Sequence, residues 1–166
     1  IKTESYEAGE AGESIGEKTL KTVYSYDIND RLLESIDYQI DGSEETVVRY
    51  TEYQYDRRGQ TTGYAELSQE NEPTADEIKA HQIRYYYDSD GKLTKVTYPT
   101  TKNGVHALSY EYDQNGWLTK IKGEVQSGDG STEKTVRSYT YDSYGKVKEI
   151  KDYRDLLNSS DPAEPL

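Results

Sequence analysis

The chain has 166 residues, a length typical of one domain, and carries a formal net charge of −12 at pH 7. This acidic balance disfavours nucleic acid and anionic membranes as partners, and the absence of cysteine excludes disulfides and thiolate catalysis. No stretch reaches the length of a membrane span.

Composition alone would suggest disorder, because only 32% of the residues are hydrophobic and the net charge is high. The 18 tyrosines argue against disorder, since each carries a large ring that can be buried at low entropic cost. We therefore expect a folded chain whose apolar side chains cover one face of a sheet, without a thick two-layer core.

The chain begins with a segment, residues 1–8, that resembles the second strand of a hairpin. Its first strand would belong to a preceding repeat. Beyond it, the pattern Tyr-x-Tyr-Asp occurs five times at nearly even spacing, with the aspartates at Asp27, Asp56, Asp88, Asp113 and Asp142. A fixed-period pattern indicates one supersecondary unit copied along the chain, with each copy packed on its neighbours.

Each copy predicts a β-hairpin. Tyr-x-Tyr favours a strand with both rings on one face, and Asp-x-x-Gly favours a type I turn closed by a left-handed residue. In the first copy Asp30 takes the place of glycine, and aspartate tolerates this conformation better than most residues. The structural residues of the motif are Tyr24, Tyr26, Asp27, Tyr53, Tyr55, Asp56, Gly59, Tyr85, Tyr87, Asp88, Gly91, Leu93, Tyr110, Tyr112, Asp113, Gly116, Leu118, Tyr139, Tyr141, Asp142, Gly145 and Val147.

Counting outward from the turns predicts the register. Tyr87 should face Leu93, Tyr85 should face Lys95, and the equivalent pairs should be Tyr112 with Leu118 and Tyr110 with Lys120. The residues between the tyrosines are mostly polar, so the opposite face should be solvated. Val96, Ile121 and Ile150 lie three residues beyond the Leu or Val position, which places them on that opposite face unless a bulge intervenes.

Turn residues also separate the hairpins, at Asp41-Gly42, Asn103-Gly104 and Gly128-Asp129-Gly130. The segment from Ser68 to Lys79 is longer and acidic, and we expect an excursion loop there. One helical turn is the alternative, because residues 74–77 have the capping-box pattern.

These elements add up to an all-β fold of about eleven strands, in which tandem antiparallel hairpins form a curved and twisted sheet. The array should cover residues 1–154, and residues 155–166 should form a polar tail. Strands at the two ends would leave open edges, so edge-to-edge self-association is expected.

The pattern Tyr-x-Tyr-Asp-x-x-Gly-x-Leu resembles the YD repeat of the RHS family, over nearly the whole chain. That family includes bacterial wall-associated proteins, polymorphic toxins, shell subunits of toxin complexes and teneurins. The resemblance implies an excised segment of a β-shell or stalk in a large secreted or cell-surface protein, whose partners are the neighbouring repeats. The Asp-Pro cleavage motif of the family is not matched by Asp161-Pro162, so self-cleavage is not implied.

The sequence predicts no enzyme, cofactor or metal site. A repeated pattern lacks the single, asymmetric group of side chains that catalysis needs, and no nucleophile motif is present. Asp88-Ser89-Asp90-Gly91 begins like a calcium loop, but Lys92 and Pro99 occupy positions where such a loop needs ligands. We interpret this segment as a turn.

The other functional interpretation is a binding module for glycans or a host protein. Trp117, together with Tyr86 and Tyr98 on the less apolar face, could stack on a sugar ring. The competing interpretation is that Trp117 covers a neighbouring hairpin.

Overall fold

The computed structural model describes residues 2–7, 19–102, 105–127 and 130–153. These residues form eleven strands and one short helix, which confirms the all-β fold and the expected number of strands. The chain divides into two compact units, Ile1–Ile83 and Arg84–Leu166. The predicted tail and the turns at residues 103–104 and 128–129 lie outside the described residues.

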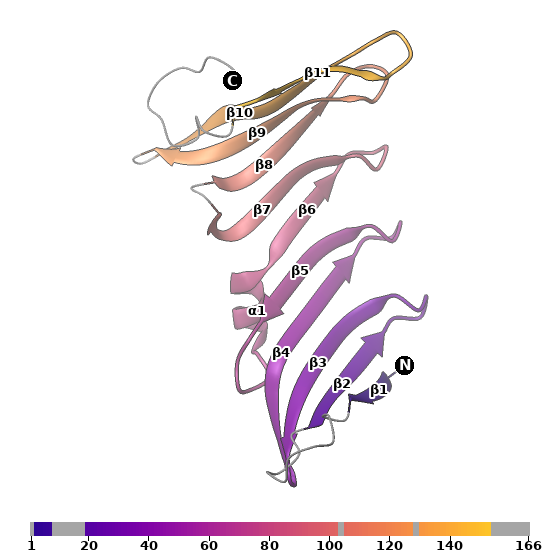
Figure 1. Ribbon diagram of the computed structural model, residues 1–166, viewed down its shortest axis with the longest axis vertical. Coiled ribbons are helices and arrows are strands. Elements are labelled where there is room, and N and C mark those ends of the chain that lie inside the picture. Colours follow the sequence, from indigo (N-terminus) through magenta and orange to yellow (C-terminus); the bar gives the residue numbers. More distant parts are fainter. Residues whose placement is uncertain (1, 8–18, 103–104, 128–129, 154–166) are drawn as a thin grey trace, which may run out of the picture. The chain divides into compact units, whose positions relative to one another are not determined.

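The first unit contains strands β1 to β5, which lie side by side in sequence order, each antiparallel to the next (Figure 1). The bounds of its elements are β1 (Lys2–Glu7), β2 (Thr19–Tyr26), β3 (Leu32–Asp41), β4 (Glu44–Tyr55), β5 (Thr61–Leu67) and α1 (Ala75–His81). The opening segment is therefore a strand, as expected, and it pairs with β2.

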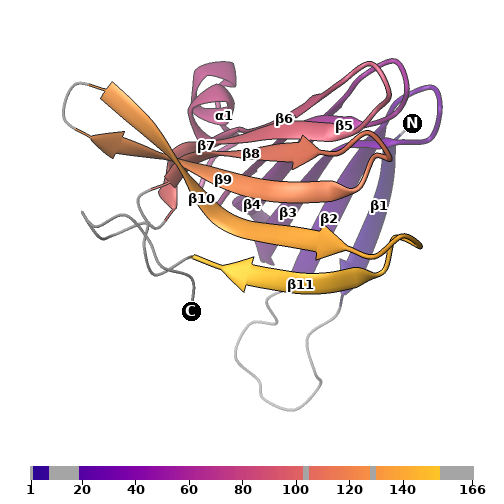
Figure 2. The ribbon, with the colours of Figure 1, turned by 90° about the horizontal axis from the view of Figure 1, so that it is seen from above.

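The second unit contains strands β6 to β11, again antiparallel and in sequence order. Their bounds are β6 (Ile83–Tyr87), β7 (Leu93–Lys102), β8 (Val105–Tyr112), β9 (Leu118–Ser127), β10 (Gly130–Tyr141) and β11 (Val147–Asp152). Figure 2 shows that these strands form an open sheet, with β11 at its edge.

The five turns lie where the sequence predicts them. In each turn the residue three positions after the motif aspartate has a positive φ, and its N–H donates to the aspartate carbonyl at 3.0–3.2 Å. The positive φ values are 58° for Asp30, 85° for Gly59, 84° for Gly91, 83° for Gly116 and 80° for Gly145. Asp30 thus adopts the left-handed conformation that glycine adopts in the other four copies.

The register is as predicted for the first pair beyond each turn and differs at the next. Tyr87 pairs with Leu93, but Tyr86 pairs with Lys95 and Tyr85 with Val96. Thr94 is therefore an extra, bulged residue, and its hydroxyl donates to the Tyr86 carbonyl at 3.1 Å. The predicted pairing of Tyr85 with Lys95 is wrong because of this bulge.

All five hairpins contain a bulge at the same place. Tyr110 consequently pairs with Ile121, not with Lys120, and Tyr139 pairs with Ile150. An aliphatic residue lies three positions beyond the Leu or Val position. Because of the bulge, its side chain points to the same face as the motif tyrosines. Each of these tyrosines is thus opposite an aliphatic side chain, where we had expected a lysine stem opposite Tyr85 and Tyr110.

The motif tyrosines are more buried than Tyr86 and Tyr144, which lie outside the two tyrosine positions of the motif. All ten are half-buried, whereas Tyr86 is 45% exposed and Tyr144 is 87% exposed. In the second unit the tyrosine face also holds Val96, which is 3% exposed and pairs with Tyr85 and Leu108.

In the first unit the main buried cluster lies on the opposite face from the motif tyrosines. Tyr50 is three residues before Tyr53 in a regular part of β4, so the two side chains point to opposite faces. Tyr50 pairs with Ile36 and Leu67, and all three are buried. The expectation of a solvated opposite face is therefore wrong for this unit, where Val47 and Ala65 complete the cluster.

Helix α1 covers part of this cluster, because its residue Ile78 packs against it. The helix begins with a complete capping box, in which Thr74 accepts from the Glu77 N–H and Glu77 accepts from the Thr74 N–H. The prediction of an excursion loop is wrong here, because the capping box and the contact of Ile78 together stabilise a helix of seven residues.

In the second unit the opposite face carries several charged pairs, which agrees with the expectation of a solvated face. Lys95 bonds to Glu124 at 3.2 Å, and Lys122 bonds to Glu111 and lies 3.7 Å from Glu133. These pairs cross β7, β8, β9 and β10. Because they are at least partly exposed, each contributes on the order of 0.2–1 kcal/mol.

Candidate functional site: the junction between successive hairpins

Each motif aspartate closes its own loop. The Asp113 Oδ1 atom accepts from the backbone N–H groups of Asn115 and Trp117, both at 2.9 Å. The same two bonds, to the residues two and four positions later, occur in every copy, at 2.8–3.0 Å. This explains the choice of aspartate: a short, charged acceptor satisfies two loop N–H groups at once.

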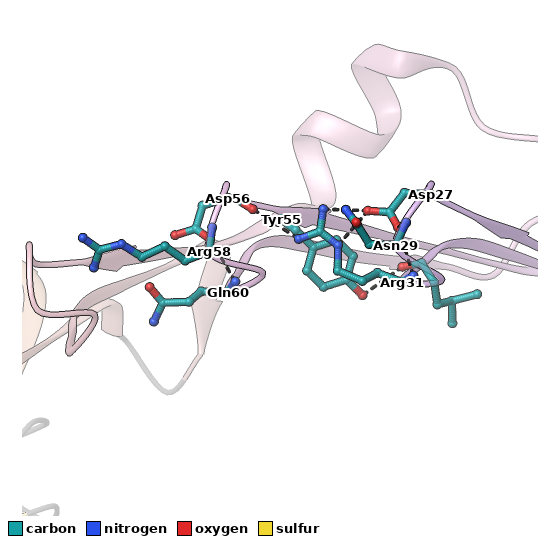
Figure 3. Close-up of polar contacts among 8 residues, drawn as sticks. Asp27, Asn29, Arg31, Tyr55, Asp56, Arg58 and Gln60 are labelled. Atoms are coloured by element: carbon teal, nitrogen blue, oxygen red, sulfur yellow. Dashed lines mark hydrogen bonds and ion pairs between the residues drawn. The ribbon is translucent and has the colours of Figure 1, made fainter.

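The first loop has an additional ion pair. Arg31 donates from Nε to the Asp27 Oδ2 atom at 2.6 Å and from Nη1 to the Asp56 carbonyl at 3.2 Å (Figure 3). The backbone N–H of Arg31, and then its guanidinium, hold the pKa of Asp27 below its usual range. Arg31 therefore links its own loop to the loop of the next hairpin.

The second tyrosine of the motif joins one hairpin to the hairpin before it. The Tyr55 hydroxyl donates to the Leu32 carbonyl at 2.9 Å. Tyr112 donates in the same way to Leu93 at 2.9 Å, and Tyr141 to Leu118 at 2.6 Å. In each case the acceptor is the carbonyl of the Leu position in the preceding copy, so these bonds form a repeated contact between hairpins.

The residue four positions after the aspartate covers the ring of this same tyrosine. The Arg31 guanidinium lies 4.8 Å from the Tyr55 ring centre. Figure 3 shows the two side chains next to each other. The Lys92 ammonium lies 5.7 Å from the Tyr112 ring, and the Trp117 ring centre lies 5.4 Å from that of Tyr141. A cation or an aromatic ring on a tyrosine face is favourable by about 0.5–1.5 kcal/mol.

The same side chains lie against the left-handed residue of the next loop. A Cβ atom added to Gly145 would lie 2.7 Å from the Trp117 ring, and one added to Gly116 would lie 2.9 Å from the Lys92 Nζ atom. Glycine at these positions thus serves the turn and also admits the neighbouring side chain. We call this combination of aspartate loop, tyrosine bond and covering side chain the junction.

Trp117 therefore covers a neighbouring hairpin, which was the competing interpretation in the sequence. Tyr98 lies on the tyrosine face, because the bulge at Thr94 reverses the alternation. Tyr86 is exposed on the opposite face from Tyr85. The expectation that Trp117, Tyr86 and Tyr98 share one face is wrong, and the structure does not bring them together.

Sequence reasoning missed the covering side chains and the acceptor carbonyls. The covering positions hold Arg31, Gln60, Lys92, Trp117 and Lys146. Their fixed distance from the aspartate was visible in the sequence. Their chemical variety hid the common role, because a cation and an indole both suit the face of a tyrosine ring.

Burial at the junctions raises the pKa of several tyrosines. This applies to Tyr55, Tyr112 and Tyr141, and also to Tyr110, where Tyr98 adds to the effect. On the opposite face, burial and then the hydrogen bond to Glu72 raise the pKa of Tyr38 to about 12.

We therefore expect the protein to lose stability in alkali. A raised folded-state pKa contributes stability that is complete below the unfolded pKa of about 10 and is lost as pH rises through the folded-state value. The free energy of unfolding should be flat up to about pH 9 and should fall between about pH 10 and 12. Tyrosinate absorbance and circular dichroism should change together. Full ionisation of the tyrosines near pH 10 with circular dichroism unchanged would contradict this expectation.

Removing one junction hydroxyl should destabilise the protein measurably. Tyr112→Phe leaves the Leu93 carbonyl without its tyrosine donor, and we expect a loss of about 1 kcal/mol in the free energy of unfolding by urea. The matched control is Tyr144→Phe, because Tyr144 is 87% exposed and its replacement should have no measurable effect. Equal midpoints for the two variants would refute the role of the hydroxyl.

Comparison with known families agrees with this geometry. The model named RHS Repeat matches residues 87–132, which include the turn of the third hairpin, the whole fourth hairpin and the start of β10. This segment is an RHS repeat. The resemblance drawn from the Tyr-x-Tyr-Asp pattern is confirmed there, and the junction of Tyr112 with Leu93 lies inside the matched residues.

Among solved structures, the chain is similar to one described as "Crystal Structure of TcdB2-TccC3-TEV". The TM-score is 0.42 and the sequence identity is 15%, over 97% of this chain and 10% of that one. The chain therefore spans about a tenth of the length of that chain. None of the curated proteins matches it.

Two observations concern sites of other kinds. Within residues 2–7, 19–102, 105–127 and 130–153, no three His, Asp or Glu side chains gather in a group that could hold a metal ion. In the same part of the chain, no helix is long and apolar enough to cross a membrane.

Proposed function

We propose that this RHS repeat module is a structural element that forms part of the wall of a shell or stalk in a large secreted or cell-surface protein. The observation that supports the proposal is the junction. Its hydrogen bond from a tyrosine hydroxyl to a backbone carbonyl recurs from Tyr55 to Leu32, from Tyr112 to Leu93 and from Tyr141 to Leu118. Contacts that repeat in this way suit a sheet extended hairpin by hairpin.

In this proposal the module is not an enzyme. Its polar side chains are used in loops and cross-strand pairs, and the same arrangement is repeated from hairpin to hairpin. Each motif aspartate, for example, accepts two N–H groups of its own loop. A carboxylate engaged in this way stabilises a turn and is not oriented toward a substrate.

Insertion of one more hairpin tests the structural role. A second copy of residues 105–129, placed after residue 129 of the full chain, gives a chain with one more junction of the same kind. Because repeat proteins gain stability from each neighbour contact, the insertion should leave the free energy of unfolding equal or higher. A matched control carries Tyr112→Phe in the inserted copy and should be less stable. Loss of folding in both chains would overturn the proposal.

A groove in the first unit favours glycan binding as a second candidate function. It has a volume of about 540 Å³ and is lined by Leu20, Thr22, Tyr24, Ser35, Asp37, Val48, Arg49 and Ser68. Asp37 accepts from Thr22 at 2.8 Å and from Arg49 Nε at 2.7 Å. An aromatic ring beside such polar groups is suited to a sugar, which offers one apolar face and several hydroxyls.

A glycan array separates the two candidates. The structural proposal predicts no saturable binding of the full chain to any glycan. Saturable binding that is lost in Arg49→Ala and retained in Arg58→Ala would instead assign the groove a binding function. Arg58 serves as the control because it lies in a loop, where its side chain is exposed.

A further inference from the structure

The groove of the first unit lies on a face that this unit does not use for its main buried cluster. That cluster is on the opposite face, where Ile78 of α1 packs against it. On the tyrosine face, a row of polar side chains instead crosses the sheet from β2 to β4, because Thr22 pairs with Asp37 and Asp37 pairs with Arg49. All three side chains line the groove, so this face is available to a ligand.

A bulge in β4 brings an aliphatic side chain into the groove beside a cationic one. The register of β3 against β4 shifts between Asp37 and Tyr38, and Val48 is the extra residue in β4. Neighbours in a regular strand point to opposite faces, but a bulge re-aims one of them. Val48 and Arg49 consequently both line the groove, which places an apolar contact directly next to a guanidinium.

The polar side chains of the groove offer donors more readily than acceptors. Among the described residues that line it, Asp37 is the one carboxylate. Its Oδ1 atom accepts from the Thr22 hydroxyl at 2.8 Å, and its Oδ2 atom lies 2.7 Å from Arg49 Nε and 2.5 Å from Arg49 Nη2. Both oxygens are thus engaged within the protein. The Arg49 side chain is held in place by this pair and is still 56% exposed, so its remaining N–H groups can donate to a ligand.

We propose that the groove binds the 2-acetamido sugars of a glycan. The pyranose ring lies against the ring of Tyr24, which lines the groove. The acetamido carbonyl accepts from the Arg49 guanidinium, and the acetamido methyl group packs against the neighbouring Val48. The inference rests on the second candidate function, glycan binding by the groove, and specifies the class of sugar. The groove volume of about 540 Å³ lies within the range of small-molecule sites, roughly 300–1,000 Å³.

Two other classes of sugar suit the groove less well. A plain hexose offers hydroxyls that are best held by free carboxylate acceptors, and it has no methyl group to cover Val48. An acidic sugar would be repelled by a chain of net charge −12, in which Asp37 and then Glu66 already act on Arg49 and raise its pKa. An acetamido group is neutral and combines a carbonyl acceptor with a methyl group, which matches the pair of side chains at the bulge.

Two oligosaccharides form a matched pair of probes. Chitotetraose is a tetramer of N-acetylglucosamine, and cellotetraose is the glucose tetramer with the same linkage. In titrations of the full chain followed by NMR, chitotetraose should bind saturably and about ten-fold more tightly than cellotetraose, because the acetamido group adds one hydrogen bond and one buried methyl group. Saturation transferred from the protein should be largest at the acetamido methyl protons.

Variants of the full chain place the site. Arg49→Ala should abolish saturable binding of chitotetraose, whereas Arg58→Ala, in an exposed loop, should leave it unchanged. Val48→Thr replaces one methyl group by a hydroxyl and should weaken binding of chitotetraose about three-fold, with binding of cellotetraose unaffected. Val147→Thr is the matched control, because Val147 is 52% exposed in the second unit and does not line the groove.

Each outcome of these titrations has a separate meaning. If neither tetramer binds saturably, the inference and the second candidate function fail together. If both bind equally and binding depends on Arg49, the groove binds glycans and the inference about the acetamido group alone is overturned. Binding that survives Arg49→Ala overturns the assignment to the groove. Should Arg49→Ala unfold the chain, as circular dichroism would reveal, the amide shifts of the unmodified protein still decide, since they should change at residues 20–24, 35–37 and 48–49.

Discussion

Replacing Gly145 with alanine should lower the free energy of unfolding by about 3 kcal/mol, a large effect for the addition of one methyl group. About 1–2 kcal/mol comes from holding an L-residue at a φ of 80°. The rest comes from the Trp117 ring, two of whose atoms would lie 2.7 and 3.0 Å from the new Cβ atom. A rigid ring packed on Tyr141 cannot move aside as a flexible side chain can, and such overpacking costs about 1–3 kcal/mol.

Gly42 provides the matched control for this experiment. It also has a positive φ, of 63°, but a Cβ atom added there would meet nothing within 4 Å. Gly42→Ala should therefore cost only the conformational term, about 1–2 kcal/mol. In a Trp117→Ala background, the cost of Gly145→Ala should fall to that of Gly42→Ala. Urea denaturation followed by circular dichroism measures all four variants, and an unchanged cost in the Trp117→Ala background would contradict the packing explanation.

The hairpins themselves could be predicted because their signals are local. Asp-x-x-Gly defines a turn within four residues, and the turn determines the first pair beyond it, such as Tyr87 with Leu93. The bulge at Thr94 could be recognised only as one of two options. The spacing from Leu93 to Val96 fits a bulge and also fits exposure on the other face. Burial of Val96 beside Tyr85 and Leu108 favours the bulge, and that burial depends on residues of two other strands.

The buried cluster of the first unit was harder to predict, because its members come from distant strands. Ile36, Tyr50 and Leu67 form a row across β3, β4 and β5 only once the register of three strands is known. The helix that covers the cluster is seven residues long, which is too short to be stable by local propensity. The capping box at Thr74 indicated where a helix could begin, and the contact of Ile78 with the cluster is what makes one form there.

The junction could be predicted from the sequence only in part. Its donor residues belong to the motif and were identified by spacing. Its acceptors are backbone carbonyls, which carry no signature in the sequence. The bond from Tyr112 to Leu93 joins residues 19 apart, and that from Tyr141 to Leu118 joins residues 23 apart. Only the packing of one hairpin on the next reveals that these atoms meet.

Replacing Asp113 with alanine should lower the free energy of unfolding by about 2–3 kcal/mol. The side chain accepts two hydrogen bonds of 2.9 Å from the N–H groups of Asn115 and Trp117, and bonds to a charged group contribute about 1.5–3 kcal/mol each when they are well shielded. This loop is only partly shielded, so the two bonds together should contribute about as much as one well-shielded bond of this kind. The loss should also weaken the next junction, because the Trp117 N–H is adjacent to the ring that covers Tyr141.

Asp113→Asn is the matched comparison, since an amide oxygen accepts the same two N–H groups without the charge. We expect it to retain more than half of the stability that Asp113→Ala loses. Two backbone bonds remain in either variant, from Asp113 N–H to the Trp117 carbonyl at 2.9 Å and from Gly116 N–H to the Asp113 carbonyl at 3.0 Å. If these bonds alone held the turn, Asp113→Ala would unfold at the same urea concentration as the unmodified protein. The presence of aspartate at this position in all five copies would then need an explanation outside the loop.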